Sequence, residues 1–276
     1  MEHFWDTIET IGAGYGFSLF GARHLVTLAL FALTAALCCR GYARADEKRR
    51  ARMRKAFAVL LLMDEAFKQI GLQIGGNFDA SYLPLHLCSI NIFLIALHAW
   101  RPSEALDNFL YYICIPAATA ALLFPTWTSL PAMNFMFLHS TSVHILLAVY
   151  PMMLFAAGDI RPSAKGIGKS LLLLLVMAVP IYAVNCLLDT NFMFLMYAPD
   201  GVVPRPLWQP LDRLSRAARG GRRRYVPAGA AEEKTRDGGG KTAALTKINA
   251  RQTLISGPAA LFHAFCLDER AGFCYF

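Results

Sequence analysis

The residues best suited to chemistry in this chain are a cysteine and a histidine, each set in an apolar stretch. Cys88 lies in LPLHLCSI, and His144 lies in FLHSTSVHILL. A thiol beside an imidazole supplies a nucleophile and a base that removes its proton and later protonates the leaving group. Such a pair would attack an acyl carbonyl, hold the acyl chain as a thioester and pass it to an acceptor hydroxyl. The pair therefore predicts acyl transfer or acyl-ester hydrolysis.

Polar neighbours of this pair are candidates for supporting roles. We expect Asn91, Asn134 or Ser142 to donate to an oxyanion, and Asp64 or Glu65 to orient the imidazole. The complete set of supporting candidates is Asp64, Glu65, Lys68, His86, Asn91, Asn134, His139, Ser142 and Asn191.

Depth along the helices favours His144 as the partner of Cys88. If the third helix starts near Leu83, Cys88 lies about 8 Å below its outer end, and His144 lies about 12 Å inside the fifth. His139 is the competitor, but on a helix it points about 140° away from His144. The plainer alternative is that the cysteine and both histidines are packing residues.

These side chains need a scaffold, and the composition indicates membrane helices. The 276 residues are 56% hydrophobic and 17% charged, with a mean hydropathy of +0.40, which is too apolar for an ordinary soluble domain. Apolar segments long enough to cross a bilayer fall at 19–39, 56–76, 82–100, 109–125, 136–157 and 170–189. We therefore predict an all-α, polytopic transmembrane helical bundle with six recognisable spans.

The distribution of charge predicts the orientation of the bundle. Eight Lys and Arg residues lie between Arg40 and Lys55, whereas the loops GLQIGGNFDAS and PTWTSLPAMN contain neither residue type. The positive-inside rule then places the first segment in the cytoplasm and the N-terminus outside. We expect a multi-pass protein of the bacterial inner membrane. The net charge of +8 fits this topology better than nucleic-acid binding, so we expect membrane lipids and no nucleic acid as partners.

The cysteine pattern indicates neither a disulfide framework nor a metal site. The seven cysteines form no CxxC pair and no Cys/His cluster with zinc spacing. We expect free thiols, no metal and no cofactor. The N-terminal stretch MEHFWDTIET is acidic and predicts no cleavable signal peptide.

The pentapeptide NFMFL occurs twice, at Asn134–Leu138 and at Asn191–Leu195. With six spans, the first copy opens the fifth span and the second follows the sixth, so both fall at the outer surface. Each Asn can cap or bridge at the polar boundary while the Phe and Met side chains enter the acyl region. The copies either repeat one solution for a membrane boundary or shape one outward-facing site together.

The chain changes character after the sixth span. Residues 1–200 read as the transmembrane domain, and residues 201–276 read as an Arg/Gly-rich tail that is disordered or aberrant. Its arginines resist translocation, although an even number of spans would place the tail outside.

At LPLHLCSI, with His144 downstream and NFMFL after the sixth span, the sequence resembles the YwaF-like family of bacterial integral membrane proteins over residues 10 to 200. That family is similar to eukaryotic multispan proteins implicated in phospholipid acyl transfer through a Cys and a His. It is more distantly similar to androgen-induced fatty-acid-ester hydrolases, which use Thr and His. The resemblance implies a seven-span bundle with lipid chemistry, Cys88 as the cysteine and His144 as the histidine. The seventh span is replaced here by the tail.

Two functions of other classes compete with the enzyme. A transporter or small-molecule binding protein would use Asp64, Glu65, Lys68 and His86 to line a polar pathway. A structural membrane scaffold would use the same charges only to pair helices. The lipid donor and acceptor do not follow from the sequence.

Overall fold

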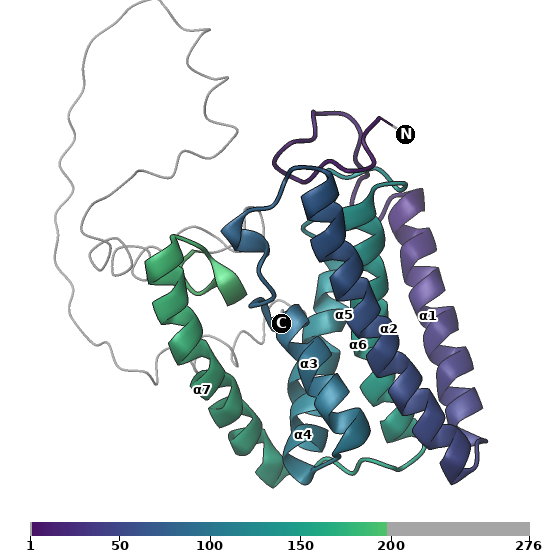
Figure 1. Ribbon diagram of the computed structural model, residues 1–276. Coiled ribbons are helices and arrows are strands. Elements are labelled where there is room, and N and C mark those ends of the chain that lie inside the picture. The colour runs from purple at the N-terminus through teal and green to yellow at the C-terminus, as the bar shows by residue number, and fades with distance from the viewer. Residues whose placement is uncertain (1, 198–276) are drawn as a thin grey trace, which may run out of the picture. The chain divides into compact units, whose positions relative to one another are not determined.

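The computed structural model describes residues 2–197, which form a helical bundle without a β-strand in that range (Figure 1). The elements are α1 (Ala22–Ala43), α2 (Glu47–Ile74), η1 (Ala80–Tyr82), α3 (Leu87–Trp100), α4 (Glu104–Phe109), η2 (Leu110–Cys114, a π-helical turn), α5 (Ile115–Leu123), α6 (Phe135–Ala156), α7 (Ala164–Leu188) and η3 (Phe192–Phe194). The predicted all-α bundle is confirmed. The tail from 201 to 276 lies outside the described residues.

Five segments of the described chain are long and apolar enough to cross a membrane. They are Ala22–Ala43, Ala80–Trp100, Glu104–Leu123, Phe135–Ala156 and Ala164–Leu188. The one remaining predicted span, the second at 56–76, is the second half of α2, which carries Asp64, Glu65 and Lys68 and is less apolar for that reason. It packs against α3 and α6 within the bundle. Each of the six predicted spans thus corresponds to one helix or to a run of consecutive helical elements, and we call each of these a helical rod.

The basic segment between the first two spans is helical. α2 begins at Glu47, ahead of the predicted start at 56, because Asp46 caps it by accepting a 2.7 Å hydrogen bond from the backbone N–H of Arg49. Lys, Arg and Ala are strong helix formers, so the capped segment continues into the apolar half without a break.

The third span is broken. The expected helix start near Leu83 is wrong, since α3 begins only at Leu87. Leu83 has an extended backbone (φ −56°, ψ 149°), as favoured for a residue that precedes a proline, here Pro84. The 14 residues of α3 rise about 21 Å, which is shorter than a hydrocarbon core of about 30 Å. The chain therefore enters this layer as irregular backbone.

Local hydrogen bonds hold the irregular entry segment, residues 79–86. Asp79 accepts a 2.9 Å bond from the backbone N–H of Ser81, and this interaction keeps the pKa of Asp79 below its usual value. Gln69 of α2 donates to the carbonyl of Tyr82 at 2.9 Å, and the Tyr82 hydroxyl donates to Glu9. Polar side chains thus satisfy backbone groups where no helix does so.

The N-terminal segment covers the end of the bundle that holds the loops without Lys or Arg (Figure 1). Asn77 donates to the Trp5 carbonyl at 2.9 Å, and the Phe17 N–H donates to the Thr128 carbonyl at 2.8 Å. Aromatic side chains of this segment pack on the outer ends of α5 and α6. This end is distinct from the basic end, as the charge pattern predicts, while the side of the membrane stays a prediction.

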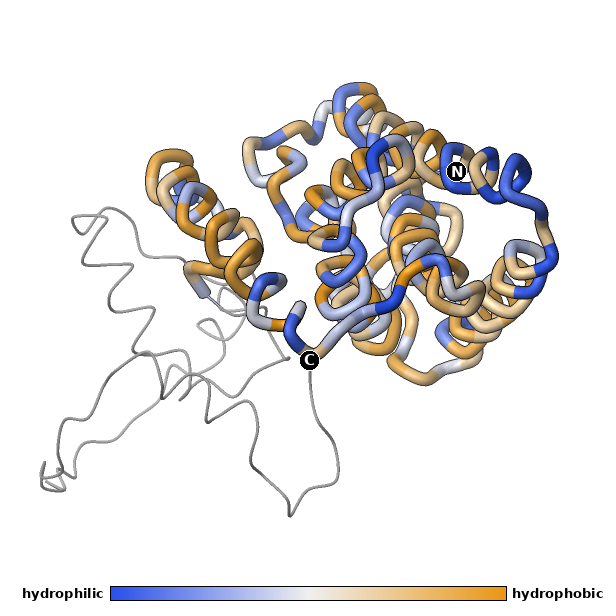
Figure 2. Tube along the Cα trace, turned by 90° about the horizontal axis from the view of Figure 1, so that it is seen from below, coloured by the Kyte–Doolittle hydropathy of each residue, from blue (hydrophilic) through white to orange (hydrophobic). Residues whose placement is uncertain are grey.

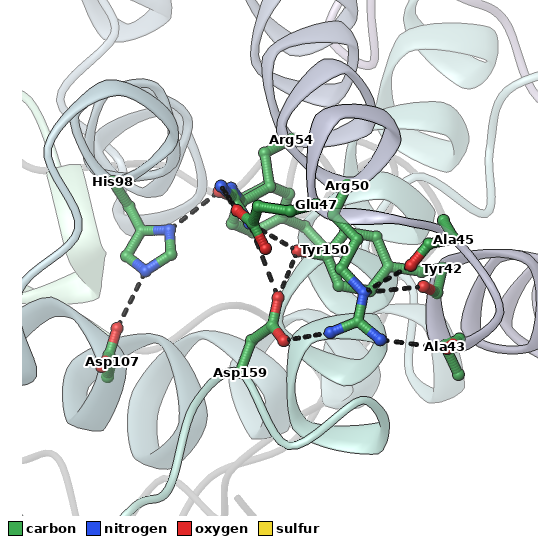
Figure 3. A network of polar contacts seen from close by, with 10 residues as sticks. All are labelled: Tyr42, Ala43, Ala45, Glu47, Arg50, Arg54, His98, Asp107, Tyr150 and Asp159. Carbon is green, nitrogen blue, oxygen red and sulfur yellow. Dashed lines mark hydrogen bonds and ion pairs between the residues drawn. The ribbon is translucent and has the colours of Figure 1, made fainter.

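Asp159 ties the basic end together (Figure 3). From the connection between α6 and α7, it accepts a bond from the Tyr42 hydroxyl at 2.7 Å and pairs with Arg50 at 2.6 Å. Arg54, one turn beyond Arg50, donates to the same Tyr42 hydroxyl at 2.9 Å. These contacts join α1, α2 and the α6–α7 connection.

A second contact at this end joins three more helices (Figure 3). His98 of α3 lies 2.8 Å from both the Asp107 carboxylate of α4 and the Tyr150 hydroxyl of α6. His98 and Tyr150 are almost fully buried. The arrangement fixes the register of α3 against α4 and α6.

Helix α7 lies at the edge of the bundle, and its tube is largely hydrophobic (Figures 1 and 2). It packs mainly on α4, where the Ser163 N–H donates to the Asn108 side chain at 3.0 Å. Gly166 is needed there, because a Cβ at this position would overlap Asn108.

The packing of α2 on α6 predicts a strong effect at Gly71. An added Cβ would lie 2.5 Å from Cδ2 of Phe135, whose fully buried ring has no room to move. We expect Gly71→Ala to lower the free energy of unfolding by about 1–3 kcal/mol. Gly41→Ala is the control, because its Cβ meets no atom within 4 Å, and it should not destabilise the protein. Thermal unfolding in detergent tests this, and equal behaviour of the two variants would contradict the close contact.

Candidate functional site

Cys88 lies in the first turn of α3, directly after the irregular entry segment. His86 is the N-cap residue, and its side chain makes no capping bond. The thiol is free, half-buried and packed against the central apolar cluster of the bundle. The break in the third span therefore places the Cys88 thiol in the first turn of a helix, against the apolar cluster of the bundle.

His144 is held by two contacts from its own neighbourhood. Its Nδ1 lies 2.6 Å from the carbonyl of Ser140, and its ring stacks on Trp127 with centroids 5.1 Å apart and planes 18° apart. A carbonyl can only accept, so Nδ1 carries the hydrogen and Nε2 has the lone pair. This is the form of imidazole that can remove a proton from a thiol.

Cys114 connects the surroundings of Cys88 with the helix that carries His144. Its thiol donates to the carbonyl of Leu147 at 3.4 Å, and Leu147 lies about one turn beyond His144 on α6. Cys88 and Cys114 belong to the same apolar cluster. No hydrogen bond joins Cys88 to His144 within residues 2–197. The two residues lie on packed helices, α3 and α6, and their pairing stays a prediction.

His139, the competing base, faces α2. Its Nδ1 lies 3.2 Å from the carbonyl and 3.5 Å from the carboxylate of Asp64. Ser142 also donates to the Asp64 carboxylate, at 2.9 Å. Asp64 thus orients the imidazole of His139, whereas His144 is oriented by a backbone carbonyl.

Glu65 and Lys68 form a buried ion pair beside these residues. Their charged atoms lie 2.6 Å apart, and each residue is 6% exposed. Gln69 donates to the same carboxylate at 2.9 Å, and Ser89, next to Cys88, does so at 3.2 Å. With these donors, Glu65 is occupied by structural contacts and binds α2 to the first turn of α3.

The second NFMFL copy packs on the entry to α3. The ring centroids of Phe192 and Phe194 lie 5.2 and 5.8 Å from the ring centroid of His86. Met193 and Phe194 have positive φ values of 56° and 52°, an uncommon conformation outside glycine. Asn191 holds this turn by accepting from the Met196 N–H at 2.9 Å. This copy therefore contacts the residue that caps the helix of Cys88.

The first NFMFL copy forms the N-terminal cap of α6. Asn134 caps α6 by accepting from the backbone N–H groups of Met136 and Phe137, and it donates to the carbonyls of His3 and Asp6. Asn134 is fully buried by these contacts. Its side-chain oxygen and nitrogen both bind backbone groups, and its predicted part in an oxyanion site stays a prediction.

Asn91 differs from Asn134 in having a buried side-chain oxygen without a hydrogen-bond partner. It lies one turn beyond Cys88 on α3 and is 1% exposed. Thr119 and Thr141 share this property. The unpaired atom is an acceptor and cannot itself donate to an oxyanion, so the predicted donor role of Asn91 would fall to its Nδ2 and stays a prediction. Within residues 2–197, no group of three or more His, Cys, Asp or Glu side chains could hold a metal ion.

Sequence reasoning did not identify Cys114 and Trp127 as parts of this region. The π-helical turn that ends at Cys114, immediately before Ile115 and Pro116, is visible only in the structure, and such turns recur at functional sites. Trp127 lies in a loop, and its contact with His144 depends on the packing of that loop against α6.

Comparison with known proteins identifies the family. The sequence model of the TMEM164 family matches residues 19–211, which is more than half of the chain. The chain belongs to the TMEM164 family. No curated protein and no solved structure matches the chain.

The region shared with the TMEM164 family contains all six helical rods and both predicted catalytic residues. Membership establishes the chain as a protein of a multispan membrane family, in agreement with its apolar helices. The YwaF-like likeness and the acyltransferase activity remain predictions.

The buried ion pair predicts an asymmetric response to mutation. Lys68→Met leaves Glu65 charged and buried, which costs about 3–5 kcal/mol of stability. The double variant Glu65→Gln/Lys68→Met removes both charges and should regain at least half of that loss. Lys55→Met, on the exposed part of α2, is the matched control. Thermal unfolding of the three variants measures the effect, and a Lys68→Met protein as stable as Lys55→Met would disprove the coupling.

Proposed function

We propose that this protein transfers a lipid acyl group, or hydrolyses an acyl ester, with Cys88 as the nucleophile and His144 as the base. The observation that carries the proposal is the break in the third span, which sets the Cys88 thiol at a helix N-terminus within the apolar layer. His144, on the packed helix α6, carries its hydrogen on Nδ1 and has Nε2 as the basic atom.

The reaction consists of two displacements at one carbonyl. His144 takes the thiol proton while the Cys88 sulfur attacks the acyl carbon of a lipid ester, and the oxyanion is stabilised by donors near the α3 N-terminus. The ester C–O bond breaks, the alcohol leaves with the proton from His144, and an S-acyl thioester remains. An acceptor hydroxyl, or water, gives its proton to His144 and attacks the thioester, which releases the product and restores the thiol.

The substrates of this reaction are membrane lipids, and no cofactor is required. The reacting side chains lie in a bundle of apolar helices, so a donor acyl chain reaches them from the bilayer. In this proposal the membrane is a bacterial inner membrane, and this end of the bundle, with the N-terminus, lies on its extracytoplasmic side, which is the orientation that the positive-inside rule predicts. Nucleic acid is not a partner in this proposal.

His139 is the competing base. It has the same Nδ1–H form, because Nδ1 faces the Asp64 carbonyl, and the Asp64 carboxylate is close to it. Its contacts with Asp64 of α2 suit a positioning residue, whereas His144 has no carboxylate contact within residues 2–197 and lies one turn from Leu147, the residue that accepts from Cys114. Separate variants of the two histidines decide between them.

Transport is the second candidate function, favoured by the charged residues inside α2. In that case Asp64, Glu65, Lys68 and His86 line a polar pathway. The direct 2.6 Å pairing of Glu65 with Lys68 supports a structural task for these two charges instead.

The test uses purified protein in nanodiscs with a radiolabelled diacyl phospholipid and a lysophospholipid acceptor. We expect label to move to the acceptor or to appear as free fatty acid, and a hydroxylamine-sensitive acyl adduct to map to Cys88. Cys88→Ala should abolish turnover and adduct. His144→Gln should lower the rate by about 10²–10⁴-fold, the usual contribution of a general base.

Two controls define the outcome. Cys39→Ala, a cysteine of α1, should retain activity, and His139→Gln should lose less than His144→Gln. Full turnover of Cys88→Ala would overturn the proposal. Absence of any acyl chemistry, together with solute uptake into proteoliposomes that survives Cys88→Ala, would establish the transporter instead.

A further inference from the structure

The basic end of the bundle contains two groups of cations with different surroundings. Arg50 and Arg54 point inward and pair with Asp159 and Glu47. The others are exposed and form no ion pair within residues 2–197. They are Arg40, Arg44, Lys48, Arg49, Arg52 and Lys55. The nearby carboxylates of Asp46, Glu47 and Asp159 are occupied by a helix cap or by the inward arginines. The outward charges are therefore available to a ligand.

Two of the exposed arginines share a shallow hollow with apolar side chains. Arg49, Arg52, Met53 and Ala56 line it, and their spacing places them on one face of α2. Farther along this face, toward the apolar half of the helix, the exposed side chains are Leu60 and Met63. The face is thus cationic at one end and apolar at the other.

A face that is cationic at one end and apolar at the other matches a lipid with an anionic headgroup. Two guanidinium groups one turn apart offer paired N–H donors, the geometry that suits a phosphate. Clusters of Lys and Arg next to a membrane helix attract anionic lipids. A soluble phosphate would use the arginines but would leave the strip from Met53 to Met63 without a partner.

We propose that the Arg49/Arg52 hollow binds an anionic phospholipid, with its phosphate between the two guanidinium groups and an acyl chain along Met53, Ala56, Leu60 and Met63. This site lies at the opposite end of the bundle from the N-terminal segment, and its occupation does not depend on the acyl chemistry proposed above. It holds a lipid of the leaflet that faces the basic end.

The chain offers a matched control for this site. Arg49→Gln/Arg52→Gln removes two charges from the hollow, whereas Lys48→Gln/Lys55→Gln removes two exposed charges from the same part of α2 that do not line it. Neither variant touches Arg50, Arg54 or Asp159. Matched thermal unfolding of both variants in lipid-free detergent confirms that the fold is retained.

The experiment measures retention of phosphatidylglycerol and phosphatidylcholine by the detergent-solubilised full chain with native mass spectrometry. We expect Arg49→Gln/Arg52→Gln to retain phosphatidylglycerol at least tenfold less well than the unmodified protein, at about fivefold per removed charge. Lys48→Gln/Lys55→Gln should stay within about threefold, and phosphatidylcholine should bind weakly to all three proteins.

Three results would overturn the proposal. Equal losses in the two variants would show diffuse attraction to the whole basic end. Unchanged retention in Arg49→Gln/Arg52→Gln would place the lipid elsewhere. Displacement of phosphatidylglycerol by an equal concentration of glycerol phosphate would identify a site for soluble phosphate that makes no use of the apolar strip.

Discussion

Irregular backbone inside the apolar layer is the constraint on which the rest of the structure depends. Residues 79–86 enter the third span with only the short 3₁₀ turn η1 in place of an α-helix, and unbonded peptide groups are costly where water is scarce. The Tyr82 carbonyl of this segment accepts from Gln69 of α2, and Ser89, in the first turn of α3 just beyond the segment, donates to Glu65 of α2. The Glu65 carboxylate, which would be costly in a lipid-facing helix, thus helps to fix the start of α3 after the irregular segment. The break in turn sets the depth at which α3 and Cys88 begin.

Helix α6 packs against the helices on both sides of this break, α2 and α3. It packs against α1, α2, α3 and α5, so the residues along it face different neighbours in turn. His139 faces Asp64 of α2, while Leu147 accepts from Cys114 near α5. The two NFMFL copies make different contacts. One caps α6, and the other packs on His86 at the cap of α3. The shared sequence therefore serves two local structures at one end of the bundle.

The helices and the two ends of the bundle could be predicted from the sequence, because apolar segment length and clustered Lys and Arg depend on local composition. The break before Leu87 could not, since Pro84 is equally suited to the first turn of a helix and the outcome depends on partners such as Gln69. The contact between His144 and Trp127, and the pairing of Arg50 with Asp159, join residues far apart in the chain. Such contacts are set by tertiary packing, on which hydropathy and residue spacing carry no information.

The proposed catalytic pair requires that the Cys88 thiol in the first turn of α3 and the His144 side chain of α6 lie within reach of one another. A short thiol cross-linker such as dibromobimane tests it most directly, in protein whose cysteines other than Cys88 are replaced by alanine. We predict efficient cross-linking of Cys88 in the His144→Cys variant and little in Leu138→Cys, whose side chain is 39% exposed on the outside of the same helix. A cross-link that forms with Leu138→Cys, or that is absent with His144→Cys, would contradict the account.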